Sequence, residues 1–263
     1  GTAFIDGQAT ITGPVKELFI NVIATTGEAT VFKVPIDDGE SLGDTSAIYF
    51  LSPEEKKARI SGETVITDKI SGLELRFELQ VTPAAEVEIT VDPTNGSYIR
   101  GRGVGNLLME INTNGKFIMN GDFIVTEGIY NFKYAGIVNK NFTIQPGGTM
   151  DWNGNPTNAN IDVEAVYTTR ANPSILLDNP NLNAQVPVEV LTKLQGDLSF
   201  FDPEFFIRFP NTNSVVSSEL QYRLEDKSQR QLQALSLVAT GSFYNPNSIG
   251  QNAVTGNVVE SVT

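Results

Sequence analysis

Hydrophobic and polar residues alternate along much of this chain. From Leu73 to Val81 every odd-numbered residue is apolar and every even-numbered residue is polar. A β-strand directs successive side chains to opposite faces, so this segment predicts a strand with one apolar face and one charged face. Similar runs recur later in the chain, separated by Gly, Asn and Pro. This pattern predicts consecutive short strands joined by turns.

The apolar members of these runs define one candidate face. They are Leu73, Leu75, Phe77, Leu79, Val81, Val87, Ile89, Val91, Leu107, Met109, Ile111, Phe117, Met119, Phe123, Val125, Ile161, Val163, Val186, Val188, Val190, Phe205 and Ile207. Charged residues such as Glu74, Glu78, Glu86 and Glu88 alternate with them and are expected to face water. Asn114-Gly115, between two alternating runs, predicts a hairpin.

Helix signals are scarce in this chain. Leucines at near-helical spacing predict one helix at about residues 218–235. Residues 52–57 also begin like a helix, with a Ser cap and Pro at the first position, but this segment is short. The fold class expected is therefore all-β with one or two short helices.

The alternation leaves open what covers the apolar face. Two sheets could bury their inner faces against each other in a sandwich. Alternatively, a single curled sheet could keep its inner face open as an apolar trough, and an exposed apolar surface of that size marks a binding site. The periodicity fits both arrangements.

Composition limits the possible partners. The chain has 263 residues, 40% of them hydrophobic, which is enough for a sizeable core. Its net charge of -13 argues against nucleic acid as a partner, because no Lys/Arg cluster is present to neutralise phosphates. The same charge disfavours docking on anionic lipid surfaces. It does not disfavour the enclosure of acyl chains, which depends on apolar burial.

Residue usage also limits the possible chemistry. The sequence has no Cys and no His, which removes disulfides, Cys-His pairs, Ser-His-Asp triads and HExxH zinc sites. Asp151, Asn153, Asn155 and Asp162 resemble a Ca²⁺ loop, but Pro156 stands where such a loop needs Gly, so a polar turn is preferred. We assign no catalytic residue, no metal ligand and no cofactor, and expect a non-enzymatic protein.

A specific series of residues lies between positions 122 and 159. It consists of Asp122, Phe123, Glu127, Gly128, Tyr130, Phe132, Gly147, Gly148, Trp152, Gly154, Pro156, Asn158 and Ala159. This series resembles the C-terminal domain of the translocation and assembly module subunit TamB family, which is related to AsmA-like bridge proteins that transfer lipids. The blend of motifs is most similar to Bacteroidetes-type members, and the resemblance covers most of the chain.

The resemblance implies an elongated, curled β-sheet groove, described as a β-taco or β-helix-like trough. It implies a single elongated β domain over residues 1–263, a fragment of a longer protein. Within it we expect preceding strands at 1–70, the groove core at 71–215, and a short helix with closing strands at 216–263. The apolar face defined above would line the groove.

The resemblance also implies a function. Phospholipid acyl chains would lie in the groove of a periplasmic protein that is anchored in the inner membrane and reaches the outer membrane. An outer-membrane β-barrel of the TamA/BamA type would be a partner of the full-length protein. We expect Phe77→Asp or Ile89→Glu to lower bound lipid while the β content is retained. The alternative is a scaffold that binds outer-membrane β-barrel proteins by strand addition, without carrying lipid.

Overall fold

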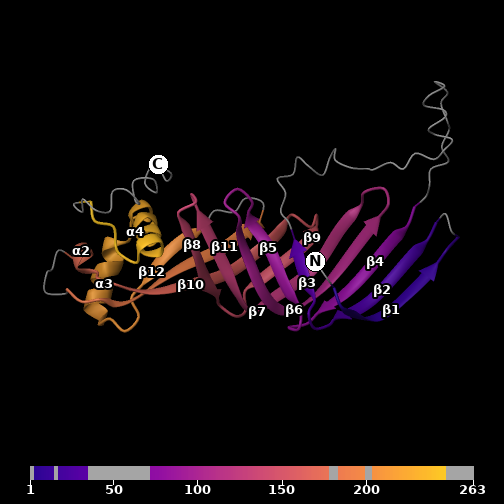
Figure 1. Ribbon diagram of the computed structural model, residues 1–263, viewed down its shortest axis with the longest axis horizontal. Helices are drawn as coiled ribbons and strands as arrows, with labels where there is room; N and C mark the ends of the chain where they lie inside the picture. Colours follow the sequence, from indigo (N-terminus) through magenta and orange to yellow (C-terminus); the bar gives the residue numbers. More distant parts are fainter. Residues whose placement is uncertain (1–2, 15–16, 35–71, 178–182, 199–202, 247–263) are drawn as a thin grey trace, which may run out of the picture.

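The computed structural model describes residues 3–14, 17–34, 72–177, 183–198 and 203–246. These residues form one large sheet with three short helices, which confirms the all-β prediction (Figure 1). The strands are β1 (Ile5–Thr12), β2 (Phe19–Thr26), β3 (Val31–Val34), β4 (Glu74–Val81), β5 (Glu86–Asp92), β6 (Ser97–Asn112), β7 (Phe117–Tyr134), β8 (Val138–Ile144), β9 (Thr149–Gly154), β10 (Ala159–Ala171), β11 (Val186–Asp197) and β12 (Glu204–Arg208).

The sheet runs in the order β1-β2-β4-β6-β7-β8-β10-β11-β12. Most neighbours are antiparallel, but β2 pairs with β4, and β3 with β5, in parallel. The hairpin predicted at Asn114-Gly115 joins β6 and β7, and Gly115 adopts a positive φ of 87° there. The expectation of short strands is wrong for β6 and β7, which have 16 and 18 residues.

A crease crosses the sheet. β4 and β5 lie end to end along one edge of β6, and β8 and β9 lie end to end along one edge of β7. Their gaps, at residues 82–85 and 145–148, align with a register shift between β6 and β7 at Arg102/Gly103. We define the crease by these three features. It separates a limb containing β2, β4 and β9 from a limb containing β3, β5 and β8, with β6 and β7 running through both.

Glycines allow β6 and β7 to approach closely at the crease. A Cβ atom on Gly103 would lie 2.1 Å from the carbonyl oxygen of Ile124, and one on Gly105 would lie 2.1 Å from that of Asp122. No side chain tolerates such a contact with the backbone, so both positions require glycine. The chain therefore continues through these glycines as strand, and the sheet bends without a turn.

The helices gather at one end of the molecule (Figure 1). They are α2 (Ser174–Leu177), α3 (Ser214–Arg223) and α4 (Lys227–Thr240). The single helix predicted at 218–235 is in fact two helices, because Asp226 accepts a hydrogen bond from the Gln229 N–H and so begins α4 anew. Between residues 216 and 246 the structure has helices and no strand. The helix candidate at 52–57 lies outside the described residues.

The end of the sheet beside the helices is a packed core. α4 contacts β8, β10, β11 and above all β12. Tyr130, Phe132, Phe142 and Phe205 form an aromatic cluster there, with the rings of Phe132 and Phe205 edge to face at 5.2 Å. Burial raises the pKa of the Tyr130 phenol above its ordinary value, so this side chain stays neutral. At this end the inner face of the sheet is closed.

Candidate functional site: an apolar groove between the limbs

A groove of about 700 Å³ lies between the two limbs of the sheet. One wall includes Phe32 and Val87 from β3 and β5, and the other includes Met109, Phe117 and Trp152 from β6, β7 and β9. The complete lining is Phe32, Lys33, Leu79, Val81, Val87, Leu107, Met109, Gly115, Phe117, Ile118, Met119, Phe123, Trp152, Gly154, Asn155, Pro156 and Thr157. Its volume lies in the range usual for ligand sites, and most of its lining is apolar.

The groove lies where the inner face changes from buried to exposed. Val190 of β11 is 0% exposed and Met119 of β7 is 6% exposed. Near the β6–β7 hairpin Phe117 is 47% exposed, and at the β1 edge Ile11 reaches 63%. The described residues form one sheet and not a two-sheet sandwich. Its apolar face is packed beside α4 and open as an apolar trough towards β1.

The predicted apolar face divides into three groups. Those that line the groove are Leu79, Val81, Val87, Leu107, Met109, Phe117, Met119 and Phe123. Those buried elsewhere in the core are Ile89, Val91, Val125, Ile161, Val163, Val188, Val190, Phe205 and Ile207. The third group belongs to neither set: Leu75, Phe77, Ile111 and Val186 are partly exposed, and Leu73 is exposed just before β4. The groove itself therefore uses fewer residues than the alternation marks.

Trp152 forms part of the groove wall. It is 5% exposed, and its indole N–H donates to the carbonyl oxygen of Pro156 at 3.1 Å. Gly154, two residues on, lies opposite Met119 of β7. The motif Trp-x-Gly-x-Pro therefore folds back on itself and places Trp152, Gly154 and Pro156 on the same groove. The indole is held in one orientation by this bond.

The rest of the motif series supports the crease and the packed core. Tyr130 and Phe132 are buried in the aromatic cluster. Ala159 of β10 lies opposite Trp152 of β9. Gly147 has a positive φ of 94° in the β8–β9 gap, where its N–H donates to Val125. The remaining members lie on the outer face, at the crease or in turns: Asp122, Glu127, Gly128, Gly148 and Asn158.

Some groove residues escaped the sequence analysis. Phe32, Ile118, Asn155 and Thr157 line the groove but were not assigned to it. Phe32 belongs to a four-residue strand whose position depends on parallel pairing with β5, more than 50 residues later in the chain. A run this short carries no usable alternation. For Asn155 and Thr157 the sequence offered only the neighbouring Pro156, which was noted as a motif member and as the residue that breaks the Ca²⁺-loop pattern.

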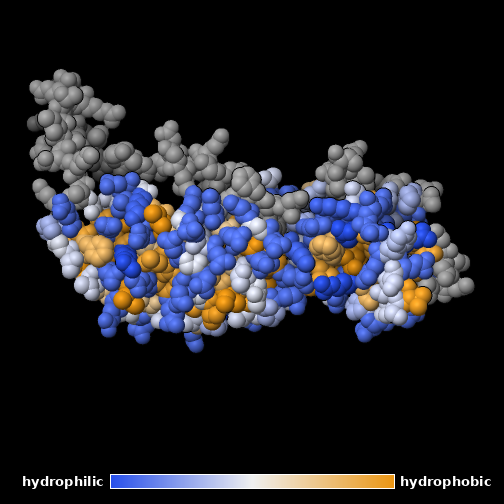
Figure 2. Space-filling view, turned by 180° about the vertical axis from the view of Figure 1, so that it is seen from behind, coloured by the Kyte–Doolittle hydropathy of each residue, from blue (hydrophilic) through white to orange (hydrophobic). Residues whose placement is uncertain are grey.

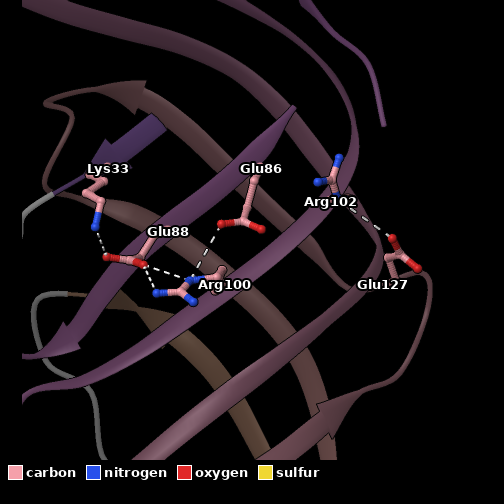
Figure 3. Close-up of polar contacts among 6 residues, drawn as sticks. All are labelled: Lys33, Glu86, Glu88, Arg100, Arg102 and Glu127. Carbon is pink, nitrogen blue, oxygen red and sulfur yellow. Dashed lines mark hydrogen bonds and ion pairs between the residues drawn. The ribbon is translucent and has the colours of Figure 1, made fainter. Parts of the chain in front are cut away.

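A network of charged side chains lies on the outer face of the sheet, behind the groove. Glu88 of β5 accepts hydrogen bonds from Lys33 Nζ at 2.9 Å and from Arg100 Nε at 2.8 Å, and Arg100 also lies 3.6 Å from Glu86 (Figure 3). The hydrogen bond from Lys33, then that from Arg100, holds the pKa of the Glu88 carboxyl below its ordinary value. These bonds link β3, β5 and β6 across the outer face, where the alternation predicted Glu86 and Glu88.

The outer surface is mainly polar. From behind, hydrophilic residues predominate and apolar residues form small patches among them (Figure 2). No group of three or more acidic residues that could hold a metal ion occurs among the described residues. Within the same residues no helix is long and apolar enough to cross a membrane. The predicted polar turn is present, with Asn155 Oδ1 accepting the N–H of Thr157 at 3.0 Å.

The creased sheet, its open groove and its helix-packed end define an elongated β protein with an apolar trough. An exposed apolar groove of this kind typically marks a binding site. The family model of the TamB C-terminal domain matches residues 1–263, the whole chain. The chain belongs to this family, whose members work with TamA in a transport and assembly module of the cell envelope. No curated protein matched the chain.

Proposed function

We propose that this chain is a non-catalytic segment of a TamB-like bridge whose groove carries phospholipid between the inner and outer membranes. The observation that carries the proposal is the apolar groove of about 700 Å³ between the limbs, lined by residues such as Met109, Phe117 and Trp152. It lies in a chain that belongs to an envelope transport family. In this function the groove holds acyl chains while the head groups stay in water.

Apolar burial would supply the binding energy. Removing apolar surface from water is favourable by about 25 cal/mol per Å², and this term depends little on the identity of the ligand. Lys33 is the one cationic residue among those that line the groove, and its ammonium group is bonded to Glu88 on the outer face. We therefore expect weak selection between head groups and stronger dependence on acyl chains.

The proposal includes a cellular setting. The full-length protein would lie in the periplasm, be anchored in the inner membrane and reach an outer-membrane β-barrel of the TamA/BamA type. By delivering lipid there it would support the assembly of outer-membrane proteins. The family membership supports this setting, because the family acts in the envelope.

Lipid retention tests the proposal. The 263-residue chain is purified from a Gram-negative host in mild buffer, and extracted lipids are identified by mass spectrometry. Phe117→Asp places a charge in the groove at a position that is 47% exposed, so folding is little affected. Ile124→Asp is the matched control, because Ile124 is 39% exposed on the other face of the same strand.

The expected result is co-purified phospholipid in the parent chain and in Ile124→Asp, and a marked loss in Phe117→Asp. Lipid-free parent protein, or equal retention by both variants, would sink the proposal. Phe77→Asp remains a useful second variant, since Phe77 is partly exposed on the inner face. Ile89→Glu is not a useful variant, because Ile89 is 1% exposed. The change would bury a charge and therefore test folding instead of lipid binding.

A second candidate is a scaffold that binds outer-membrane β-barrel proteins by strand addition. Its supporting observation is the edge strand β1, whose eight residues are all exposed. It predicts a protein free of lipid, with client binding that is unaffected by Phe117→Asp. The lipid analysis above therefore separates the two functions.

A further inference from the structure

The exposure of the groove lining falls in one direction along β7. Phe117, Met119 and Phe123 lie on the same face of this strand, and all three line the groove. Phe117 is 47% exposed, Met119 is 6% exposed and Phe123 is 2% exposed. The groove is therefore open beside the β6–β7 hairpin and becomes enclosed towards the crease.

Described side chains close the groove at the crease. The ring of Phe123 reaches across to β6, since a Cβ atom on Gly103 would lie 2.7 Å from the Cζ atom of this ring. Val81, the last residue of β4, is 2% exposed, and Phe32 of β3 packs against the same core. We call Phe32, Val81 and Phe123 the end wall. Beyond it Ile89 is 1% exposed, so the inner face there is packed and the groove does not continue.

The two ends of the groove also differ in polarity. At the hairpin end the lining includes Gly115 and, from the turn after β9, Asn155 and Thr157, which carry groups able to hydrogen-bond with a polar ligand. The end wall is apolar. The ammonium group of Lys33 does not serve it, because that group is bonded to Glu88 on the outer face. A charged head group at the end wall would lose water without gaining a partner from the wall, which is costly.

We propose that the groove holds an acyl chain in one orientation, with its methyl end against the end wall and its head group at the hairpin end. The end wall then sets the longest chain that the groove buries completely. This inference rests on the proposed function. It adds the direction in which the lipid lies and the residues that select its length.

The length of the groove fits one acyl chain. Phe117 and Phe123 are six residues apart on one strand, which at about 3.3 Å per residue corresponds to about 20 Å. With C–C bonds of about 1.5 Å, an extended chain advances by about 1.25 Å per carbon, so about 16 carbons fill this length. We expect affinity to rise about fourfold with each added carbon up to this length and to stop rising beyond it, because only buried methylenes contribute.

Trp152 tests the orientation. It lies opposite Gly121 of β7, nearer to Phe123 than to Phe117 along that strand. Phospholipids brominated in the distal half of the acyl chain should therefore quench its fluorescence more strongly than phospholipids brominated beside the carboxyl end, at equal amounts of bound lipid. Equal quenching by the two probes, or stronger quenching by bromine beside the carboxyl end, would refute the orientation.

Single-chain lysophospholipids of increasing chain length test the end wall, below the concentration at which they form micelles. Leu107→Phe adds bulk to the lining opposite Gly121 and should move the length limit to shorter chains. Phe32→Ala removes part of the end wall and should move the limit to longer chains. Val104→Phe is the matched control, because it adds bulk at a 40% exposed position on the outer face of the same strand as Leu107 and should leave the limit unchanged.

Thermal unfolding shows which variants are folded, and Leu107→Phe decides alone if Phe32→Ala is not. Affinity in the parent chain that keeps rising well beyond the predicted length would refute the end wall. The same length limit in the parent chain and in folded Leu107→Phe would also refute it. In both of these outcomes the parent chain still binds lipid, so the proposed function stands. A parent chain that binds no lipid would overturn the proposed function and this inference together.

Discussion

Gly105 of β6 lies directly opposite Phe123 of β7, at the crease of the sheet. A Cβ atom on Gly105 would lie 3.0 Å from the Cα of Phe123 and 2.1 Å from the carbonyl oxygen of Asp122. Phe123 is 2% exposed and lines the groove. Because Gly105 has no side chain, β6 can approach β7 closely, and this close approach buries the aromatic ring of Phe123.

Replacing this glycine should destabilise the fold. Gly105→Val forces the backbones of β6 and β7 apart, and we expect a loss of about 2 kcal/mol in the free energy of unfolding, as for other overpacked sites. Urea titration followed by circular dichroism measures this loss. Val104→Ala is the control on the adjacent, 40% exposed residue and should change stability little. Equal stability of Gly105→Val and the parent chain would show that the crease relaxes easily.

Trp152 should report on groove occupancy. It is the only Trp of the chain, and it lines the groove. Phospholipid with brominated acyl chains should therefore quench its fluorescence. Loss of one buried Phe contact costs about 1.5–3 kcal/mol, so Phe117→Asp should raise the lipid concentration for half-maximal quenching by about tenfold or more. Unquenched emission at saturating lipid would place the acyl chains away from Trp152.

The Glu88 network should stabilise the fold in a pH-dependent way. Because the pKa of Glu88 is lowered in the folded protein, its contribution is complete well above the ordinary carboxyl pKa of 4.5. The contribution is lost as pH falls through the lowered value. Lys33 is more than half exposed, so we expect Glu88→Gln to cost about 0.5–1 kcal/mol at pH 7 and almost nothing near pH 3.

Urea titrations of the parent chain and Glu88→Gln at both pH values measure this difference. Glu78→Gln provides a comparison, since Glu78 and its partner Arg76 are both more than 40% exposed and should contribute less. A Glu88→Gln difference that is the same at pH 3 as at pH 7 would mean that packing rather than charge accounts for the effect.

Arg230 should hold the helical end of the sheet together. Its guanidinium donates to the carbonyl oxygens of Phe205, Leu224 and Glu225 and to the Glu204 carboxylate. We expect Arg230→Ala to lower the free energy of unfolding by about 2 kcal/mol, because several charged hydrogen bonds are lost and their partly buried carbonyl acceptors are left unpaired. Lys227→Ala, at an exposed position on the same helix, should have little effect in the same denaturant titration.

The predictions from sequence were sound where local pattern decides the structure. The alternation from Leu73 to Val81 places Leu79 and Val81 on the inner face, and that of the next run places Glu86 and Glu88 on the outer face, as observed. The turn at Asn114-Gly115 is also where it was predicted. Side-chain direction in a strand has a period of two, so a few residues suffice to assign a face.

The sequence could not show how far each inner-face residue would be buried. Ile161 and Phe117 carry the same alternation signal, yet Ile161 is 0% exposed and Phe117 is 47% exposed. The difference arises because β10 lies at the end of the sheet that α4 covers, whereas Phe117 is the first residue of β7, beside the β6–β7 hairpin. The break between α3 and α4 was likewise missed, since the leucine spacing continues across it.

The sequence by itself determined the strand-rich fold, the division of side chains between two faces, and the series of motif residues that marks the family. The tertiary structure decided that one sheet creases into a trough, and that its end is closed by α4 and its groove opens near Phe117. The reason is physical: which face a side chain takes is local, but closure depends on which distant strands and helices meet it.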